Sequence, residues 1–558
     1  MKKTGIFALT AAAALVLSAC SGTSGSGKAS ASASGSTQLA AGDYLEASYD
    51  ELKDGGNLTL PISELTAQMN PFQQDGTLYT STMWYWYNPQ LALFDADGTW
   101  HFNPDYFTDV KAEEKDGNTV VTYDIREEAK FNDGTPIDVK AFQNTWKSNN
   151  GEDADYLPSS TDGYERITSV EAGTSDKQVV VTFDGIYAWW QGLFNDVLHP
   201  AVNTAKLYNE TYLNAAHPEY GAGPYKVKNY DPQGGVITFE RNEKWWGPKG
   251  KLDSITYRQM ESQASINAFK NGEIDATSVG TADHLAQIKG MENVSVYTAT
   301  LTANYLMTLN AKSGPLQDKA VRKAIFESID RSQLATIRFN GIDYHEDAPG
   351  SFLLFESQKG YEDNFSKVAS FDPENAKKEL DAAGWTAGSD GIRAKDGEKL
   401  TVNYVEFGDD QTTKNLGLAI QQELKAVGVD LQIDSRAGTE FSNTLAKNDF
   451  DMLLMGFSSS DPFGVAYFGQ IYASDGLNRS GTTWEPTDER LKKLQEIGDP
   501  DEQIAEANKL EVEALSEYGI MPTFNGPDKV AVKSDLANTG AMGFAVIPKE
   551  NIGYVASK

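Results

Sequence analysis

A polar loop in the last third of the chain carries residue types well suited to holding a ligand. It comprises Gly456, Phe457, Ser458, Ser459, Ser460, Asp461 and Pro462, so backbone groups, hydroxyls and a carboxylate stand side by side. The residues just before it, 450–455, form an apolar run typical of a strand inside a sheet. Ligands of open α/β sheets bind beyond the carboxyl ends of such strands. The sequence therefore predicts a ligand-binding site at residues 456–462.

The segment before this loop is expected to position it through alternating strands and helices. Apolar residues alternate over 400–404 and again over 429–433, which is the period of a half-buried strand. Between them, residues 416–427 are apolar at helical spacing, and a second helix is predicted over 440–446. A helix that joins two neighbouring strands usually leaves them parallel. We therefore expect a crossover unit that leads into the strand at 450–455.

Four consecutive aromatic residues, 84–87, form a second candidate binding feature. Adjacent residues of a helix or strand cannot all face one side, so some of these rings must face a second surface. In one interpretation they all pack in the core and at a domain interface. In the other, Trp84 and Trp86 line the ligand pocket, since aromatic walls accept varied side chains.

Patterns typical of enzymes and metal sites are lacking in the sequence. It contains no Gly-x-Ser-x-Gly nucleophile motif. Carboxylate pairs such as Asp409-Asp410 are frequent in so acidic a chain and indicate solvated surfaces. The histidines show no metal-ligand spacing; they are His101, His199, His217, His284 and His345. We therefore expect a protein that is not an enzyme and has no metal and no cofactor.

The formal net charge of −32 narrows the range of partners. Nucleic-acid binding needs basic patches, so this composition argues against a nucleic-acid partner. Two explanations of the charge stay open. The acidic residues either keep the protein soluble, or those near the site favour cationic ligands.

The N-terminus has the pattern of an exported protein. Two lysines precede a short apolar run over residues 6–17, which predicts a signal peptide over 1–19. The residues Leu-Ser-Ala-Cys at 17–20 resemble the lipobox of bacterial lipoproteins, so Cys20 is expected to be lipidated. Cys20 is the single cysteine, and an internal disulfide is therefore excluded. We expect residues 20–55, rich in Ser, Gly and Ala near their start, to be the lipidated cysteine and a flexible tether.

A series of short motifs along the rest of the chain carries a family resemblance. In order they are Lys-Phe-Asn-Asp-Gly-Thr-Pro at 130–136, Gly-Ala-Gly-Pro-Tyr at 221–225, Gly-Glu-Ile-Asp at 272–275, a segment at 314–325, and a capped helix at 372–385. Together with the polar loop they resemble bacterial extracytoplasmic solute-binding proteins of family 5, the oligopeptide and dipeptide receptors of ABC importers. The resemblance covers about residues 56–558. These motifs report the fold and do not name the ligand.

The resemblance implies an α/β periplasmic-binding-protein fold with two jaws, a hinged cleft, mixed sheets flanked by helices, and an extra inserted domain. Lobe I is then discontinuous and comprises residues 56–91, 219–296 and 518–558. Lobe II, 92–218, is the insertion, and lobe III, 297–517, is the opposite jaw. The hinge is expected near 296 and 518, where the chain passes between lobes I and III.

The implied function is that of a monomeric receptor outside the cytoplasm, anchored by lipid to the bacterial cell membrane. It would capture an oligopeptide, close, and deliver it to the permease of an ABC transporter. Backbone groups near Gly456, Phe457 and Ser458 would bind the peptide as an extended strand. An oligosaccharide receptor on the same fold is the alternative, and an adhesive surface lipoprotein is a third possibility.

Asp461 has two possible roles under this resemblance. In relatives that take peptides, an aspartate just beyond a Gly-Trp pair holds the α-ammonium group of the peptide. Here Phe457 stands in the tryptophan position, Ser460 aligns with the aspartate, and the acid follows one place later. Asp461 therefore either holds the ammonium group or caps a turn with Pro462, since Asp-Pro is a turn signal.

Overall fold

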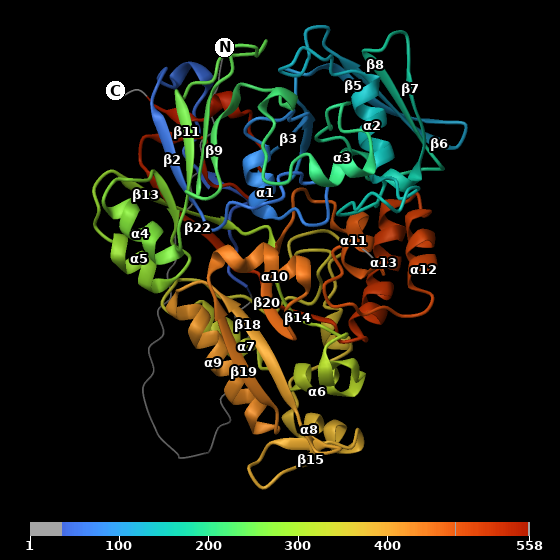
Figure 1. Ribbon diagram of the computed structural model, residues 1–558, viewed down its shortest axis with the longest axis vertical. Coiled ribbons are helices and arrows are strands. Elements are labelled where there is room, and N and C mark those ends of the chain that lie inside the picture. Colours follow the sequence, from blue (N-terminus) through green and yellow to red (C-terminus); the bar gives the residue numbers. More distant parts are fainter. Residues whose placement is uncertain (1–35, 475, 556–558) are drawn as a thin grey trace, which may run out of the picture.

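The computed structural model describes residues 36–474 and 476–555, which form three lobes (Figure 1). The predicted signal peptide, Cys20 and most of the predicted tether lie outside these residues. None of the helices within the described ranges is long and apolar enough to cross a bilayer. Lobes I and II lie side by side at the top of Figure 1, and lobe III extends below both.

Lobe I is built on two sheets. The first has the order β2 (Asn57–Ile62), β11 (Ser254–Gln259), β10 (Val236–Arg241) and β9 (Tyr225–Asp231). The second has the order β12 (Ala276–Ser278), β22 (Pro527–Lys533) and β13 (Val294–Thr300). Helices α1 (Leu78–Trp84), α4 (Ser262–Lys270) and α5 (Ala282–Ile288) pack around them. Ile237 and Phe239 of β10 are fully buried while their neighbours along the strand are half-buried, so alternation directs one face into the core.

Lobe II is a four-stranded antiparallel sheet covered by one helix. Its order is β5 (Phe107–Lys115), β6 (Asn118–Ile125), β8 (Gln178–Phe183) and β7 (Ile167–Ala172). Helix α2 (Val139–Asn149) begins at Asp138, whose side chain accepts a hydrogen bond from the Lys140 amide. Helix α3 (Ala205–Glu210) leads back toward lobe I.

Lobe III contains the predicted crossover unit. Its sheet has the order β19 (Asp430–Arg436), β18 (Thr401–Phe407), β20 (Met452–Ser458), β14 (Ala303–Leu309) and β21 (Ile520–Phe524). Strands β18 and β19 are joined by α9 (Gln411–Ala426) and pair in parallel, as the sequence pattern predicted. The helices around the sheet include α6 (Lys319–Glu327), α7 (Arg331–Arg338), α8 (Pro373–Ala382), α10 (Phe441–Lys447), α11 (Phe468–Tyr472), α12 (Thr487–Gln495) and α13 (Pro500–Leu515).

Short strands complete the lobes. The two-residue and three-residue ladders are β1 (Asp43–Tyr44) with β24 (Gly540–Ala541), β3 (Ala92–Phe94) with β4 (Trp100–Phe102), β23 (Leu536–Ala537) with β25 (Gly553–Tyr554), and β15 (Thr386–Ala387), β16 (Arg393–Lys395) and β17 (Glu398–Lys399).

The two passages between lobes I and III differ from the expected positions near 296 and 518. Strand β13 pairs with β22 of lobe I as far as Thr300, and β14 of lobe III begins at Ala303. Strand β21 pairs with β14, so it belongs to lobe III although residues 518–558 were expected in lobe I. The chain therefore crosses at 301–302 and again at 525–526. These positions depend on which distant strands pair, and a local sequence pattern cannot predict that pairing.

The N-terminal part of lobe I also begins earlier than expected. Asp43 pairs with Ala541, Leu52 is 4% exposed, and Leu52 forms a bridge with Val555. The predicted flexible tether over 20–55 is therefore wrong for its last part. Tyr44 and Leu52 supply the apolar side chains that the Ser-rich and Gly-rich start of the segment lacks, and these dock it on lobe I.

Candidate ligand-binding site

The structure places Asp461 in a turn directly after β20. Its side chain is 3% exposed, and Oδ1 accepts a hydrogen bond from the Phe463 amide at 2.9 Å. Oδ2 lies 2.7 Å from the Tyr467 hydroxyl and 3.2 Å from the Ser460 hydroxyl, both of which donate to it. Burial raises the pKa of Asp461, and the hydrogen bonds from Tyr467 and Phe463 oppose that rise. The turn role predicted for Asp461 is therefore observed, and its carboxylate is desolvated.

The loop that carries Asp461 lies against lobe II. The ring of Phe463 is centred 6.4 Å from that of Phe94 and 6.0 Å from that of Trp189. Gly98 has a φ of +91°, and a Cβ there would lie 2.8 Å from Cγ of Pro462. This close approach and left-handed backbone both require glycine. The end of the predicted loop at Pro462 and Phe463 is thus packed against lobe II.

Strand β20 presents a free edge beside this loop. Its pairing with β14 runs from Leu309↔Met452 to Ala303↔Ser458, along the whole strand. Its pairing with β18 is limited to Tyr404↔Met452 and Val405↔Leu453. Within the described residues, the last part of β20 therefore has strand-forming backbone groups without a strand partner on that side. Such an edge can accept an extended chain as an additional strand.

Gly456, Phe457 and Ser458, predicted as part of the loop, are the last residues of β20, and Ser459 and Ser460 follow it. Gly456, Ser458 and Ser460 are exposed, and Ser459 donates its amide to the Thr302 carbonyl at 2.8 Å. Phe457 is half-buried with its ring centred 5.7 Å from that of Phe352. It borders a small hollow whose other walls are Leu306, Thr308, Met455, Ile471, Leu477, Asn478, Arg479, Ser480 and Ile520. Of the six predicted residues from Gly456 to Asp461, the structure therefore leaves three exposed and buries Asp461.

Trp84 and Trp86 are buried in the core of lobe I. They are 1% and 4% exposed, and their indole nitrogens donate to Oδ1 of Asp196 at 3.3 Å and to the Tyr257 hydroxyl at 2.9 Å. Trp84 packs against Tyr212, with ring centres 5.2 Å apart. Their burial supports the core-packing interpretation of this aromatic run and does not support the prediction that these two rings line the pocket.

Tyr85, between the two indoles, is the aromatic residue of this run that approaches the predicted site. It is half-buried, and its pKa is raised by burial and by the nearby carboxylates of Asp196 and Asp461. Asp196 belongs to lobe II and Asp461 to lobe III. Carboxylates from two lobes therefore both act on the pKa of a residue from lobe I.

The sequence did not single out Asp196 or Lys549, which complete this group. Burial raises the pKa of Asp196 to about 7, while the Trp84 hydrogen bond and the charge of Lys549 oppose the rise. Burial lowers the pKa of Lys549 to about 8, and its ammonium lies 5.4 Å from the centre of the Trp86 ring. Neither residue stands in a recognisable motif, so only the folded chain shows that Asp196 lies beside Trp84 and Lys549 beside Trp86.

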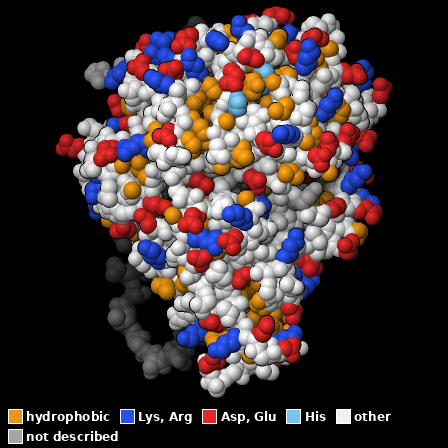
Figure 2. All heavy atoms as spheres, in the orientation of Figure 1, with side chains coloured by type: hydrophobic (Ala, Val, Ile, Leu, Met, Phe, Trp, Pro, Cys, Tyr) orange, Lys and Arg blue, Asp and Glu red, His pale blue; other side chains and the backbone are white. Residues whose placement is uncertain are grey.

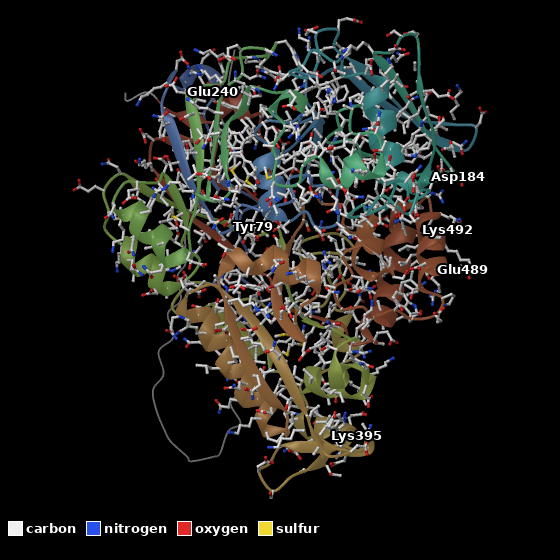
Figure 3. The ribbon with its side chains drawn as sticks, viewed as in Figure 1. Tyr79, Asp184, Glu240, Lys395, Glu489 and Lys492 are labelled. Atoms are coloured by element: carbon white, nitrogen blue, oxygen red, sulfur yellow. The ribbon has the colours of Figure 1, made fainter. Side chains whose placement is uncertain are left out.

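Lobe I also meets lobe III directly below α1. Tyr79, labelled in Figure 3, lies at this junction with its ring centred 6.3 Å from that of Phe441 on α10. Glu64 of lobe I accepts hydrogen bonds from the amide and hydroxyl of Ser442, at 3.2 and 2.8 Å. Lobes I and III are therefore in contact on this side as well.

The sequence and the fold match known solute-binding proteins. Residues 96–479 match the family described as bacterial extracellular solute-binding proteins, family 5 middle. The chain belongs to this family. It is 35% identical over 512 residues to the oligopeptide-binding protein OppA of Mycobacterium tuberculosis, an alignment that covers 90% of this chain and 85% of the relative.

Solved structures confirm the predicted fold class. The oligopeptide-binding protein AppA of Bacillus subtilis, in complex with a nonapeptide, superimposes with a TM-score of 0.77 at 19% identity over 90% of this chain and all (100%) of that one. The periplasmic EDTA-binding protein EppA gives a TM-score of 0.77 at 23% identity, and the match covers 93% of this chain and 99% of EppA. The architecture is shared while the bound ligands differ, so the ligand must be argued from the site.

Proposed function

We propose that this chain is the peptide-binding subunit of an ABC importer, which captures oligopeptides outside the cytoplasm and delivers them to a membrane permease. The observation that carries the proposal is the free edge of β20 ending at a buried carboxylate between the jaws. The 35% identity to a mycobacterial oligopeptide-binding protein over most of both chains supports the same ligand class.

The geometry suits a peptide in extended conformation. Backbone groups of Gly456, Phe457 and Ser458 can pair with a peptide backbone whatever its side chains are. At the end of that edge, Asp461 can accept the α-ammonium group. A cation there would compensate the charge of the desolvated carboxylate, whose pKa is raised by burial. The ligand strand and its terminus would thus be held by different groups of the same lobe.

Ligand identity can be tested directly on the purified protein. Mass spectrometry of the small molecules released on denaturation should find peptides with free amino termini. Calorimetry with the identified peptide should then give one site per chain. Release of a neutral oligosaccharide instead, bound with higher affinity than any peptide, would replace the peptide assignment by the alternative ligand class.

On the face shown in Figure 2, acidic and basic side chains are interspersed over all three lobes. The net charge of −32 therefore forms no single acidic surface on this face. This favours solubility as the role of most of the acidic residues. Preference for a cationic ligand would then come from the few carboxylates at the site, Asp196 and Asp461.

Ligand binding should close the jaws. Lobe III is joined to lobe I by two passages, at 301–302 and 525–526, which is the connectivity of a hinge. Small-angle X-ray scattering should therefore show a smaller radius of gyration with saturating peptide than without it. An unchanged scattering profile, with binding verified by calorimetry on the same sample, would contradict hinge closure.

Membrane attachment through Cys20 is the second part of the proposal. It is supported by the residues at 17–20 and by the absence of any other cysteine. In cells, Cys20→Ser should release the protein from the membrane fraction or block its maturation, because the thiol that would carry the lipid is gone. A processed Cys20→Ser protein that stays with the membranes would contradict lipid anchoring. A conservative substitution in the tether, Ser21→Ala, is the matched control.

A further inference from the structure

Lobes II and III also meet at a buried carboxylate other than that of Asp461. Asp162, in the segment between α2 and β7 of lobe II, is 7% exposed. Its Oδ2 accepts a hydrogen bond from the Gln470 amide at 2.8 Å, and its Oδ1 accepts one from Nε2 of Gln495 at 3.2 Å. Both donors belong to lobe III. From its own lobe the carboxylate accepts a hydrogen bond from the Ser160 hydroxyl at 2.8 Å.

Lobe III is shaped to receive this side chain. A Cβ on Gly469 would lie 2.5 Å from Oδ1 of Asp162, so a larger residue there would displace the carboxylate. Gln495, the last residue of α12, is 2% exposed, and its Nε2 also donates to the Ala466 carbonyl at 3.1 Å. Gln495 is thus held by a hydrogen bond within lobe III that does not involve lobe II.

The contact contributes only when the two lobes are together. Burial raises the pKa of Asp162 to about 7, and hydrogen bonds from Ser160 and from the amides of Gln470 and Gly469 oppose that rise. With the lobes apart, water would solvate the carboxylate and the lobe III donors alike. Burial on closure disfavours the charged form of Asp162, and the contact favours closure because, with the lobes together, removing the carboxylate would leave the Gln470 amide without this acceptor.

We propose that Asp162 is a positioning residue that latches lobe II to lobe III and so sets the ratio of closed to open receptor. The inference rests on the proposed function, because the latch would lengthen the time for which a captured ligand stays bound. The contact itself is a property of the chain and can be measured without a ligand. This separates a failure of the latch from a failure of the peptide proposal.

The distance between the lobes can be measured by electron paramagnetic resonance. Asp184 of lobe II and Lys492 of α12 are exposed and lie on facing sides of the boundary between these lobes (Figure 3). Spin labels on Asp184→Cys and Lys492→Cys, in the mature chain carrying Cys20→Ser, report this separation free of other thiols. Spectra are recorded alone and with a tryptic digest of casein as the peptide probe.

The parent should show a short-distance population that grows with the digest. Asp162→Ala should lower the ratio of short to long distances about tenfold, which corresponds to about 1.4 kcal/mol. Gly469→Ala, which obstructs the same contact from the other lobe, should act alike. Adding Gly469→Ala to Asp162→Ala should change little further, since the two substitutions remove one interaction.

Three outcomes would overturn the latch. They are a parent without the short-distance population in either condition, an Asp162→Ala distribution equal to that of the parent, and fully additive effects of the two substitutions. Glu489→Ala is the matched control, because this carboxylate of α12 is exposed and pairs with Lys493 of its own helix. Thermal unfolding of each variant separates loss of the latch from loss of the fold. If the digest neither binds in calorimetry nor changes the distances, the peptide proposal fails while the latch is still judged on the ligand-free spectra.

Discussion

Asp461→Asn is expected to weaken the binding of a peptide with a free amino terminus by about tenfold to a hundredfold. The substitution keeps the size of the side chain and removes the charge that would pair with the α-ammonium group. A charge-assisted hydrogen bond is worth about 1.5–3 kcal/mol, and each 1.4 kcal/mol is about a factor of ten in affinity. Titration calorimetry with one peptide on both proteins measures the loss.

An N-acetylated copy of the same peptide is the control that isolates the charge. It cannot present an ammonium group, so it should bind the parent and the Asp461→Asn protein nearly alike. Asp461 also accepts hydrogen bonds from the Phe463 amide and the Tyr467 hydroxyl, so the substitution could disturb the turn. Damage to the turn would weaken both peptides equally, and that result would leave Asp461 as a turn residue only.

Tyr467→Phe offers a second, independent check on the turn. It removes the hydroxyl 2.7 Å from Oδ2 of Asp461 and leaves the carboxylate in place. If Asp461 acts through its charge, this variant should retain the preference for the free peptide over the acetylated one. A variant that loses the preference as completely as Asp461→Asn would assign the effect to the loop geometry and not to the charge.

The sequence predicted those parts of the fold that are encoded in short-range patterns. Alternating and helical spacing between residues 400 and 433 predicted a crossover, and β18, α9 and β19 form it in parallel register. The positions of the passages between lobes could not be predicted in this way. Strand β21 belongs to lobe III because it pairs with β14, more than 200 residues away in the chain. No local pattern distinguishes a strand that joins one sheet from a strand that joins another.

At the site too, features encoded in a short segment could be predicted, and features that depend on distant residues could not. The strand β20 runs three residues further than predicted, to Ser458, and residues 459–462 follow it, so a site at the end of this strand could be predicted from the sequence. Asp196 comes from a segment far from that loop, and only the assembled lobes let it act with Asp461 on the same residue, Tyr85. The run at 84–87 was ambiguous for a different reason. Its composition suits a pocket and a core equally, and the packing partners that decide between them are remote in sequence.

Trp84→Ala is expected to lower the free energy of unfolding by about 3–5 kcal/mol, the usual range for truncating a large buried ring. Trp84 is 1% exposed and packs against Tyr212, Tyr87 and Phe72, with ring centres 5.2, 6.0 and 6.4 Å away. The cavity would lie in the core of lobe I. The Asp196 carboxylate would also lose the indole nitrogen that donates to it at 3.3 Å.

Urea denaturation followed by far-ultraviolet circular dichroism measures this loss. Leu78→Ala, on the same helix but 57% exposed, is the matched control and should change stability by less than about 0.5 kcal/mol. Trp84→Phe keeps an aromatic ring in the core, so it should lose less stability and, if Trp84 only packs, should bind peptide as the parent does. In the opposite outcome, the Trp84→Ala protein would be as stable as the parent but would no longer bind peptide. That outcome would place the indole in the ligand pocket, because a side chain that stabilises only the ligand leaves the unfolding of the free protein unchanged.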